Sequence, residues 1–123
     1  MRKESSTNHK NKNLLKDVCP LMFSLTKIGN RWKPYVLWKL MDGNMRFAEL
    51  KRGIPNITER MLILSLKELA EDGLIDRLDY KQVPPKVEYS LTPSAKRLKS
   101  IFDELYSWGR LEMKKSNALP VRM

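Results

Sequence analysis

The alternation of apolar and polar positions predicts a helix between Thr58 and Gly73. Leu62, Leu66 and Leu69 recur at the spacing of one helical stripe. Thr58 suits the residue that caps a helix N-terminus, and Gly73 suits the residue that follows a helix C-terminus. A helix of about 15 residues is about 22 Å long and fits the major groove of DNA. Periodicity alone leaves open whether this helix contacts DNA or only fills a core.

Three further helices are predicted before this one. Apolar residues at helical spacing extend over residues 14–28, 32–41 and 46–52. Gly29-Asn30 breaks the first pattern, and an Asp-Gly-Asn turn over residues 42–44 breaks the second. Prolines in these segments lie near the expected helix starts, where the missing backbone N–H is tolerated.

A period of two replaces the helical period after Gly73. Residues Leu74–Lys81 alternate imperfectly between apolar and polar side chains, whereas Val87–Leu91 alternate cleanly. Between them, Gln82–Lys86 contains two prolines, which a central strand does not accommodate. The two segments therefore predict a β-hairpin with Lys86 near its tip.

A last helix is predicted from Pro93 to about Lys115. Thr92 suits its N-cap, and proline is favoured at the first helical position. Its apolar stripe consists of Leu98, Ile101, Phe102, Leu105 and Trp108. This is more apolar surface than a small core needs, so two interpretations stay open: packing within the protomer, or packing against a second copy.

Charge indicates an anionic partner. The 123 residues carry a net charge of +10, which is typical of proteins that bind nucleic acids. Residues 44–91 contain eight basic and eight acidic side chains, so the excess comes from the two ends of the chain. The helix after Thr58 therefore lies in a neutral segment, and most of the positive field originates elsewhere.

Composition argues against several other classes of protein. One cysteine excludes an intramolecular disulfide, and one histidine leaves few ligands for a zinc site or a Ser-His-Asp triad. We therefore expect no enzyme, no metal and no cofactor. Apolar runs are short, and no signal peptide is recognisable, so we expect a cytoplasmic protein with no membrane partner.

The domain organisation follows from length and polarity. Residues 14–116 are expected to form one domain, because the chain has no Gly- or Ser-rich linker. Residues 1–13 are polar and basic, and are expected to be a disordered arm, whereas residues 117–123 are expected to be a frayed tail.

The order of elements is typical of a winged helix-turn-helix. A short helix, a brief connection, a longer helix and a hairpin with a Pro-Lys tip follow one another. The expected fold class is α+β, mainly α, with a two-stranded hairpin as the wing. In such a fold the longer helix enters the major groove, and the wing brings a cation to the adjacent backbone.

Side chains opposite the apolar stripe of the longer helix are the expected DNA contacts. At about 100° per residue, the core side comprises Leu62, Leu66, Leu69, Ala70 and Gly73. Bases are contacted from the N-terminal part of the helix, which selects Arg60, Met61, Leu64 and Lys67. Arg60 suits a bidentate contact to guanine, and Met61 or Leu64 suits a thymine methyl group.

Several short motifs carry a resemblance to a known family. They are Cys19-Pro20, Ile28-Gly29 with Trp32, Arg46-Phe47 with Glu49-Leu50, Ile57-Thr58 with Arg60-Met61-Leu62, Leu66-Lys67-Glu68-Leu69, Asp72-Gly73-Leu74-Ile75, and Pro84-Pro85-Lys86-Val87-Glu88-Tyr89 with Leu91-Thr92. On these motifs the chain resembles the HxlR-type branch of bacterial winged helix-turn-helix transcription regulators. The resemblance covers about 90 residues in register, and its last run is specific.

The resemblance implies a homodimer that binds a pseudo-palindromic operator and represses or activates nearby genes. By position, it implies DNA contacts at Arg46, Thr58, Arg60 and Lys86. It also implies a dimer interface formed by the first and last long helices, with Leu21, Leu25, Phe102, Leu105 and Trp108. Base preference does not carry over, because Ile63 and Leu64 stand where smaller or polar residues are common in the family.

Cys19 has two interpretations. Its place beside Pro20, at an expected helix N-terminus, is one where the helix dipole favours a negative charge. Some members of the family that this chain resembles use a matching cysteine to sense oxidants or electrophiles. We favour the other interpretation, an unreactive cysteine buried in an interface. Under either interpretation of Cys19, the sequence does not identify a small-molecule effector.

Two alternatives to a sequence-specific regulator are weighed on the residues. A general basic nucleic-acid-binding protein would need stacking aromatic side chains on an exposed sheet, and the hairpin offers only Tyr80 and Tyr89. A small enzyme ranks last, because the sequence shows no glycine-rich phosphate loop and no nucleophile–base pair.

Overall fold

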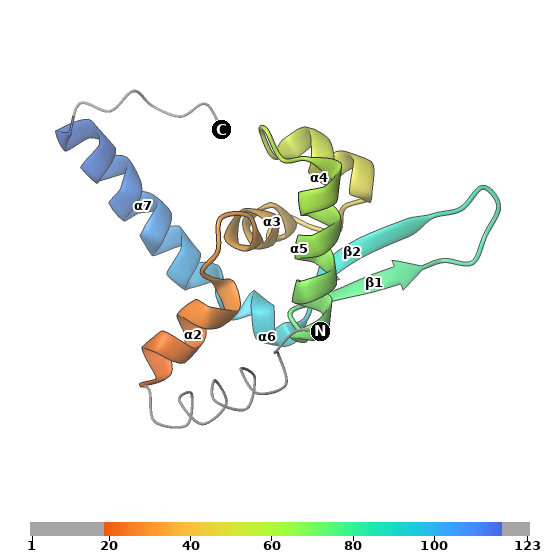
Figure 1. The fold of residues 1–123 in the computed structure, drawn as a ribbon, viewed down its shortest axis with the longest axis horizontal. Coiled ribbons are helices and arrows are strands. Elements are labelled where there is room, and N and C mark those ends of the chain that lie inside the picture. Colours follow the sequence, from red (N-terminus) through yellow and green to blue (C-terminus); the bar gives the residue numbers. More distant parts are fainter. Residues whose placement is uncertain (1–18, 117–123) are drawn as a thin grey trace, which may run out of the picture.

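A computed structural model describes residues 19–116, which form helices around one two-stranded sheet (Figure 1). In chain order the elements are α2 (Pro20–Ile28), α3 (Lys33–Leu40), α4 (Phe47–Gly53), α5 (Glu59–Glu71), β1 (Ile75–Asp79), β2 (Val87–Leu91), α6 (Pro93–Lys96) and α7 (Lys99–Lys115). The predicted α+β winged helix-turn-helix is confirmed. The predicted arm of residues 1–13, the first residues of the predicted helix 14–28 and the tail 117–123 lie outside the described residues.

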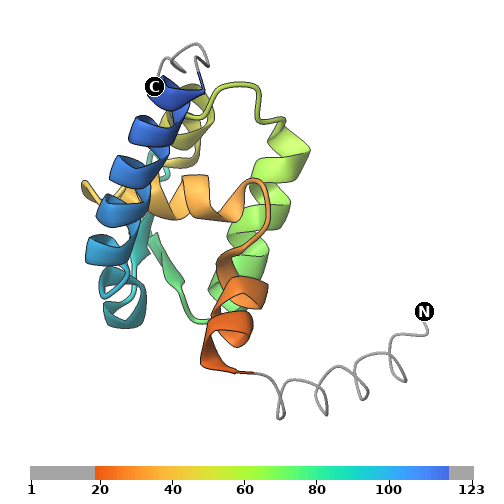
Figure 2. The ribbon, with the colours of Figure 1, turned by 90° about the vertical axis from the view of Figure 1, so that its left-hand side faces the viewer.

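The core lies where α3, α4, α5 and the base of the hairpin meet. Helix α3 crosses the middle of the molecule, with α5 on one side and α7 on the other (Figure 2). The buried apolar side chains are Val36, Leu37, Leu40, Leu50, Ile54, Ile57, Leu62, Leu66, Leu69, Ile75, Leu91, Ala95 and Phe102. Each large member contributes about 1.5–3 kcal/mol to folding, so this cluster fixes α5 against the rest of the domain.

Both ends of α5 are set by the residues that the sequence indicates. The Thr58 hydroxyl accepts a hydrogen bond from the Met61 backbone N–H at 3.1 Å, which caps the N-terminus. At the other end, Gly73 has a φ of +74°. Its N–H donates to the Ala70 carbonyl, and the Leu74 N–H donates to the Leu69 carbonyl. This pair of bonds is a Schellman motif, which needs a left-handed residue after the helix.

The hairpin is antiparallel, with Ile75 opposite Leu91 and Asp79 opposite Val87. Its base is extended by one residue from the segment before α4. The Met45 N–H donates to the Tyr89 carbonyl at 3.1 Å, and the Tyr89 N–H donates to the Met45 carbonyl at 2.8 Å. This bridge fixes the wing relative to α4 and therefore relative to the helix-turn-helix.

The prediction of one continuous final helix is wrong. The chain forms the one-turn helix α6 and then α7, with a break at Arg97 and Leu98. Their N–H groups donate to the carbonyls of Ser94 and Ala95, three residues back, which is the tighter 3₁₀ pattern. Ala95 before the break and Phe102 after it are both in the core, so α6 and α7 are each attached to the rest of the domain by a buried side chain.

The wing and the terminal helices lie on opposite sides of the molecule (Figure 1). The wing extends away from the helices, whereas α2 and α7 lie on the far side of α3 from it. None of the α2 residues is buried, and α7 buries only Phe102. Within residues 19–116, no helix is long and apolar enough to cross a membrane.

Candidate nucleic-acid interface

The outward face of α5 carries one cation in the first turn of the helix and a second cation further along it. Arg60 and Lys67 are exposed, and between them Ile63 and Leu64 are 53% and 44% exposed. This face therefore offers both polar and apolar groups to a partner.

The core side of α5 is rotated from the prediction. Leu62, Leu66 and Leu69 are buried as predicted, but Ala70 and Gly73 are exposed and Ser65 is buried in their place. The reason is that α5 packs against both α3 and β1, which moves the centre of the buried arc away from Leu66 toward Ser65 and Leu69.

This rotation changes the expected base contacts. Met61 is half-buried and packs against the core, so it has little free surface for a thymine methyl group. Ile63, which the sequence prediction did not include, is exposed. The periodicity contained this signal, because Ile63 lies away from the leucine stripe, but the choice of Leu66 as the centre of the buried arc hid it.

Arg46 lies at the start of α4, where its backbone is fixed and its side chain is exposed. The Arg46 N–H donates to the Glu49 carboxylate at 2.8 Å, and the Arg46 carbonyl accepts from Leu50. Thr58 lies at the exposed start of α5, where its hydroxyl is engaged as the cap. Both residues therefore mark helix N-termini, whose free N–H groups attract anions.

The wing holds Lys86 through an aromatic side chain. Its ammonium group lies 4.6 Å from the centre of the Tyr80 ring, a cation–π distance. The Tyr80 hydroxyl donates to the Glu88 carboxylate at 2.8 Å. This hydrogen bond lowers the pKa of Glu88 and raises the pKa of Tyr80. Lys86 is thus held beside the two strands rather than being free at the tip.

A groove of about 610 Å³ runs between α5 and the wing. Its floor is mainly apolar, and Lys67 and Arg77 are among the residues that line it; the others are Phe47, Glu59, Ile63, Leu66, Ala70, Val87 and Tyr89. Arg77 was not selected from the sequence. Its position in an alternating strand gave no reason to prefer it over other cations, and only the packing of the wing beside α5 brings it to the groove.

A second, apolar surface covers α2 and α7. Leu21 and Leu25 on α2 are 65% and 47% exposed, and Leu105 and Trp108 on α7 are 60% and 64% exposed. Phe102, predicted at the dimer interface, instead belongs to the protomer core. It is 6% exposed and lies 6.4 Å from the Trp38 ring, because α7 needs one side chain to attach it to α3.

Cys19 is exposed and is the N-cap residue of α2. Its side chain makes no capping hydrogen bond, so the sulfur atom is open to reagents in the protomer. Burial of this thiol, which the interpretation as an inert cysteine requires, therefore needs a partner surface.

Comparison with known proteins decides the family. A family model described as HxlR-like helix-turn-helix matches residues 27–117. The chain belongs to the HxlR-like helix-turn-helix family. In Bacillus subtilis, the HTH-type transcriptional regulator YybR is 45% identical over 109 residues, which cover 85% of this chain and 87% of YybR. The regulator YkvN of the same organism is 55% identical over 89 residues, which cover 71% of this chain and 75% of YkvN.

Solved structures agree with this family. The redox regulator HypR in its reduced form superposes with a TM-score of 0.76 at 42% identity, covering 82% of this chain and all of HypR. The reduced regulator YodB of B. subtilis gives a TM-score of 0.66 at 37% identity, covering 74% of this chain and 90% of YodB. This member of the HxlR-like family is therefore a DNA-binding transcription regulator with a winged helix-turn-helix.

Proposed function

We propose that this regulator is a homodimer that recognises a pseudo-palindromic operator by its sequence. The observation that carries the proposal is the outward face of α5, where Arg60 and Lys67 flank exposed apolar side chains at the N-terminal half of the helix. Helix-turn-helix proteins place this part of the helix against base edges.

Each cation has a role set by its position. Arg60, in the first turn of α5, is the proposed contact to guanine, and Leu64 with Ile63 is the proposed contact to thymine methyl groups. Phosphate contacts are assigned to Arg46, Lys67 and Lys86. Thr58 adds the N-terminus of α5, because N–H groups there bind phosphate oxygens.

The homodimer is proposed from the apolar surface of α2 and α7. One winged helix makes few base contacts, and a two-fold dimer doubles them at a spacing of about one DNA turn. Leu21, Leu25, Leu105 and Trp108 are the proposed interface, since a partner surface would remove them from water. Helices α2 and α7 lie on the far side of α3 from the wing (Figure 1), so dimerisation through them would leave the wing free for DNA.

A gel-shift titration tests the proposal. The duplex is the region flanking the gene for this protein, and a shuffled duplex of equal length is the control. We expect binding to the flanking region to be at least about 10³-fold tighter. Equal affinity for the two duplexes contradicts sequence-specific recognition and favours the alternative, a non-specific basic nucleic-acid-binding protein.

The structure gives a reason to prefer the specific regulator to that alternative. Non-specific binding to single strands uses exposed aromatic rings as stacking platforms. In the wing, Lys86 lies over one face of the Tyr80 ring, the Tyr80 hydroxyl is bonded to Glu88, and Tyr89 is only partly exposed. Because the function is to bind DNA, we also propose that the protein is not an enzyme and that it acts in the cytoplasm, where the chromosome lies.

We further propose that operator binding responds to an oxidant or electrophile through Cys19. The thiol is exposed at the start of α2, and HypR is named as a redox regulator. A second candidate effector is a small apolar ligand, because an open cavity of about 280 Å³ between α3 and α7 is lined mainly by aromatic side chains; the lining residues are Arg31, Pro34, Tyr35, Trp38, Phe102, Leu105 and Tyr106.

Alkylation of the native protein tests the thiol. We expect iodoacetamide to modify Cys19, detected by mass spectrometry, and to change operator affinity. A Cys19→Ser variant should keep operator binding and lose the response. No modification of the folded dimer would show that the partner buries Cys19, which is the inert interpretation.

A further inference from the structure

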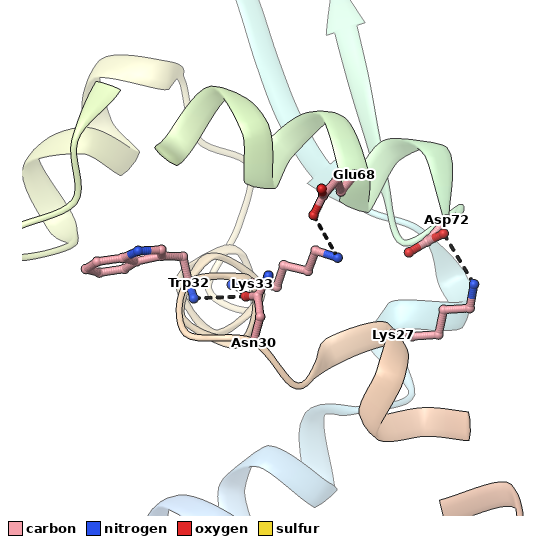
Figure 3. Close-up of polar contacts among 6 residues, drawn as sticks. All are labelled: Lys27, Asn30, Trp32, Lys33, Glu68 and Asp72. Atoms are coloured by element: carbon pink, nitrogen blue, oxygen red, sulfur yellow. Dashed lines mark hydrogen bonds and ion pairs between the residues drawn. The ribbon is translucent and has the colours of Figure 1, made fainter. Parts of the chain in front are cut away.

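Two ion pairs join the bend between α2 and α3 to one face of α5 (Figure 3). The Lys33 ammonium lies 3.0 Å from a Glu68 carboxylate oxygen, and the Lys27 ammonium lies 3.4 Å from an Asp72 carboxylate oxygen. Lys27 and Lys33 lie on either side of the bend, whereas Glu68 and Asp72 lie on successive turns of α5, about 6 Å apart along its axis.

Lys33 is anchored deeply. In the part of the chain that the structure describes, it is the one charged residue that is buried, at 9% exposure. Its backbone is fixed as well, because the Asn30 side-chain oxygen accepts from the N–H groups of Trp32 and Lys33 at 3.0 and 2.8 Å. A buried ammonium group needs a charged partner, so the ion pair fixes Glu68 beside Lys33.

The acidic residues do not serve the stability of α5 itself. Asp72 is its C-cap, Glu71 is its last residue, and its last turn has no basic side chain. Carboxylates at a helix C-terminus are unfavourable because the helix dipole is negative there. Glu68 and Asp72 therefore gain their favourable interaction from the lysines of the bend rather than from α5.

Helix α2 is attached to the body of the protomer only near its C-terminal end. It has no fully buried residue, so its direction depends on the bend, on the packing of the partly buried Ile28 against the core, and on the contact from Lys27 to Asp72. Two contacts one turn apart restrain both the tilt of α5 and its rotation against the bend, whereas one contact would leave a hinge.

We propose that Lys27, Lys33, Glu68 and Asp72 are positioning residues that set the angle between the dimerisation helix α2 and the DNA-contacting helix α5. They would thereby select the distance between operator half-sites. This inference rests on the proposed function, because α2 is fixed to the two-fold axis only if the dimer forms through it. With these four residues in place, the dimer would bind DNA whose two half-sites have one particular spacing.

Binding to a set of operators tests the proposal. An operator selected from a random duplex pool is varied by one added or one removed base pair between its half-sites, which rotates one half-site by about 35° relative to the other. The measured quantity is the ratio of affinities for the selected spacing and the altered spacings. Asp72→Asn and Glu68→Gln remove one pair each, and Asp103→Asn is the matched control because it removes the exposed pair with Lys99 inside α7.

We expect the wild type and Asp103→Asn to share one ratio. Asp72→Asn should lower that ratio about two- to fivefold, as the loss of one partly exposed ion pair predicts, and the double variant with Glu68→Gln should lower it further. A variant that combines Lys27→Asp with Asp72→Lys keeps an ion pair with the two charges exchanged, so it should restore the wild-type ratio. Asp72→Asn removes a charge that the helix dipole disfavours, so the fold should stay intact by circular dichroism.

Three outcomes overturn the inference. If both variants keep the wild-type ratio, the ion pairs do not set the spacing. If they weaken binding to every spacing equally, they contribute only to stability. If the wild type itself selects no paired half-sites, the proposed dimeric function fails, and the inference fails with it for that separate reason.

Discussion

At the scale of single residues, the proposed interface separates side chains that read bases from side chains that contact phosphates. Arg60 projects from the first turn of α5, and Lys86 lies on the wing against the Tyr80 ring. A bidentate arginine distinguishes guanine from other bases, whereas an ammonium group near the backbone does not distinguish sequences. Removal of each cation should therefore change DNA binding in a different way.

We expect Arg60→Ala to reduce discrimination between the operator and a shuffled duplex by about 5- to 150-fold, equivalent to roughly 1–3 kcal/mol of lost base contact. Competition gel shifts at fixed salt measure it. If discrimination is unchanged, the assignment of the outward face of α5 is incorrect.

Lys86→Ala is the matched control and has its own expected result. Affinity for all duplexes should fall by a similar factor, and the slope of log affinity against log salt should decrease by about one unit. A change of sequence preference with an unchanged salt slope would contradict the role of Lys86 as a phosphate contact.

The hydrogen bond from Tyr80 to Glu88 makes a prediction about pH. Because this bond lowers the pKa of Glu88 below its usual value of 4.5, it stabilises the wing above that pH and is lost as pH falls through the lowered value. Tyr80→Phe should raise the pKa of Glu88, measured by NMR titration of its carboxyl carbon. A pKa that does not move would show that the bond is absent in solution.

At the scale of elements, the C-terminal end of α5 depends on the backbone conformation of one glycine. Gly73 has a φ of +74°, where a side chain is strained. We expect Gly73→Ala to lower the free energy of unfolding by about 1–2 kcal/mol, measured by urea denaturation.

Gly109→Ala is the control with the opposite expected sign. Gly109 lies inside α7, and a Cβ atom there meets nothing within 4 Å. The alanine should raise the free energy of unfolding by about 0.5–1 kcal/mol. Equal effects at the two positions would contradict the left-handed conformation of Gly73.

Local signals in the sequence were sufficient for the elements that have their own start and stop residues. Thr58 and Gly73 bound α5, and Thr92-Pro93 begins α6, as predicted. The break after α6 was not predictable, because neither Arg97 nor Leu98 is a glycine or proline that would stop a helix, and only the hydrogen bonds of the structure show it. A helical period describes one helix and contains no information about where tertiary packing bends it.

The sequence was sufficient to predict which helix forms the candidate site, but not which face of that helix is exposed. Arg60 and Lys67 are exposed on α5, as the period suggests. Met61 and Ile63 were misplaced, since the rotation of α5 is set by its contacts with α3 and β1. Arg77 and the ion pairs of the bend depend on elements that are distant in the sequence, so no local pattern marks them.

At the scale of the whole molecule, DNA contact and dimerisation are assigned to opposite sides of α3. Helices α2 and α7, which carry exposed apolar side chains, lie away from the wing (Figure 1). We expect Trp108→Glu to give a monomer by analytical ultracentrifugation, because a charge at a buried interface is costly. Since Trp108 is 64% exposed in the protomer, the fold should be retained by circular dichroism.

Val83→Glu provides the comparison for that variant. Val83 is 96% exposed in the loop of the wing, so a glutamate there should leave the dimer intact. If Trp108→Glu and Val83→Glu are both dimers, the interface lies elsewhere than on α7.

Selection of bound duplexes from a random DNA pool tests the central claim most directly. Two copies of the outward face of α5, related by a two-fold axis, should enrich an inverted repeat with half-sites about one helical turn apart. The same selection with Arg60→Ala should lose a guanine from each half-site. Enrichment of a single half-site, or of no sequence, would contradict recognition of an operator by a homodimer.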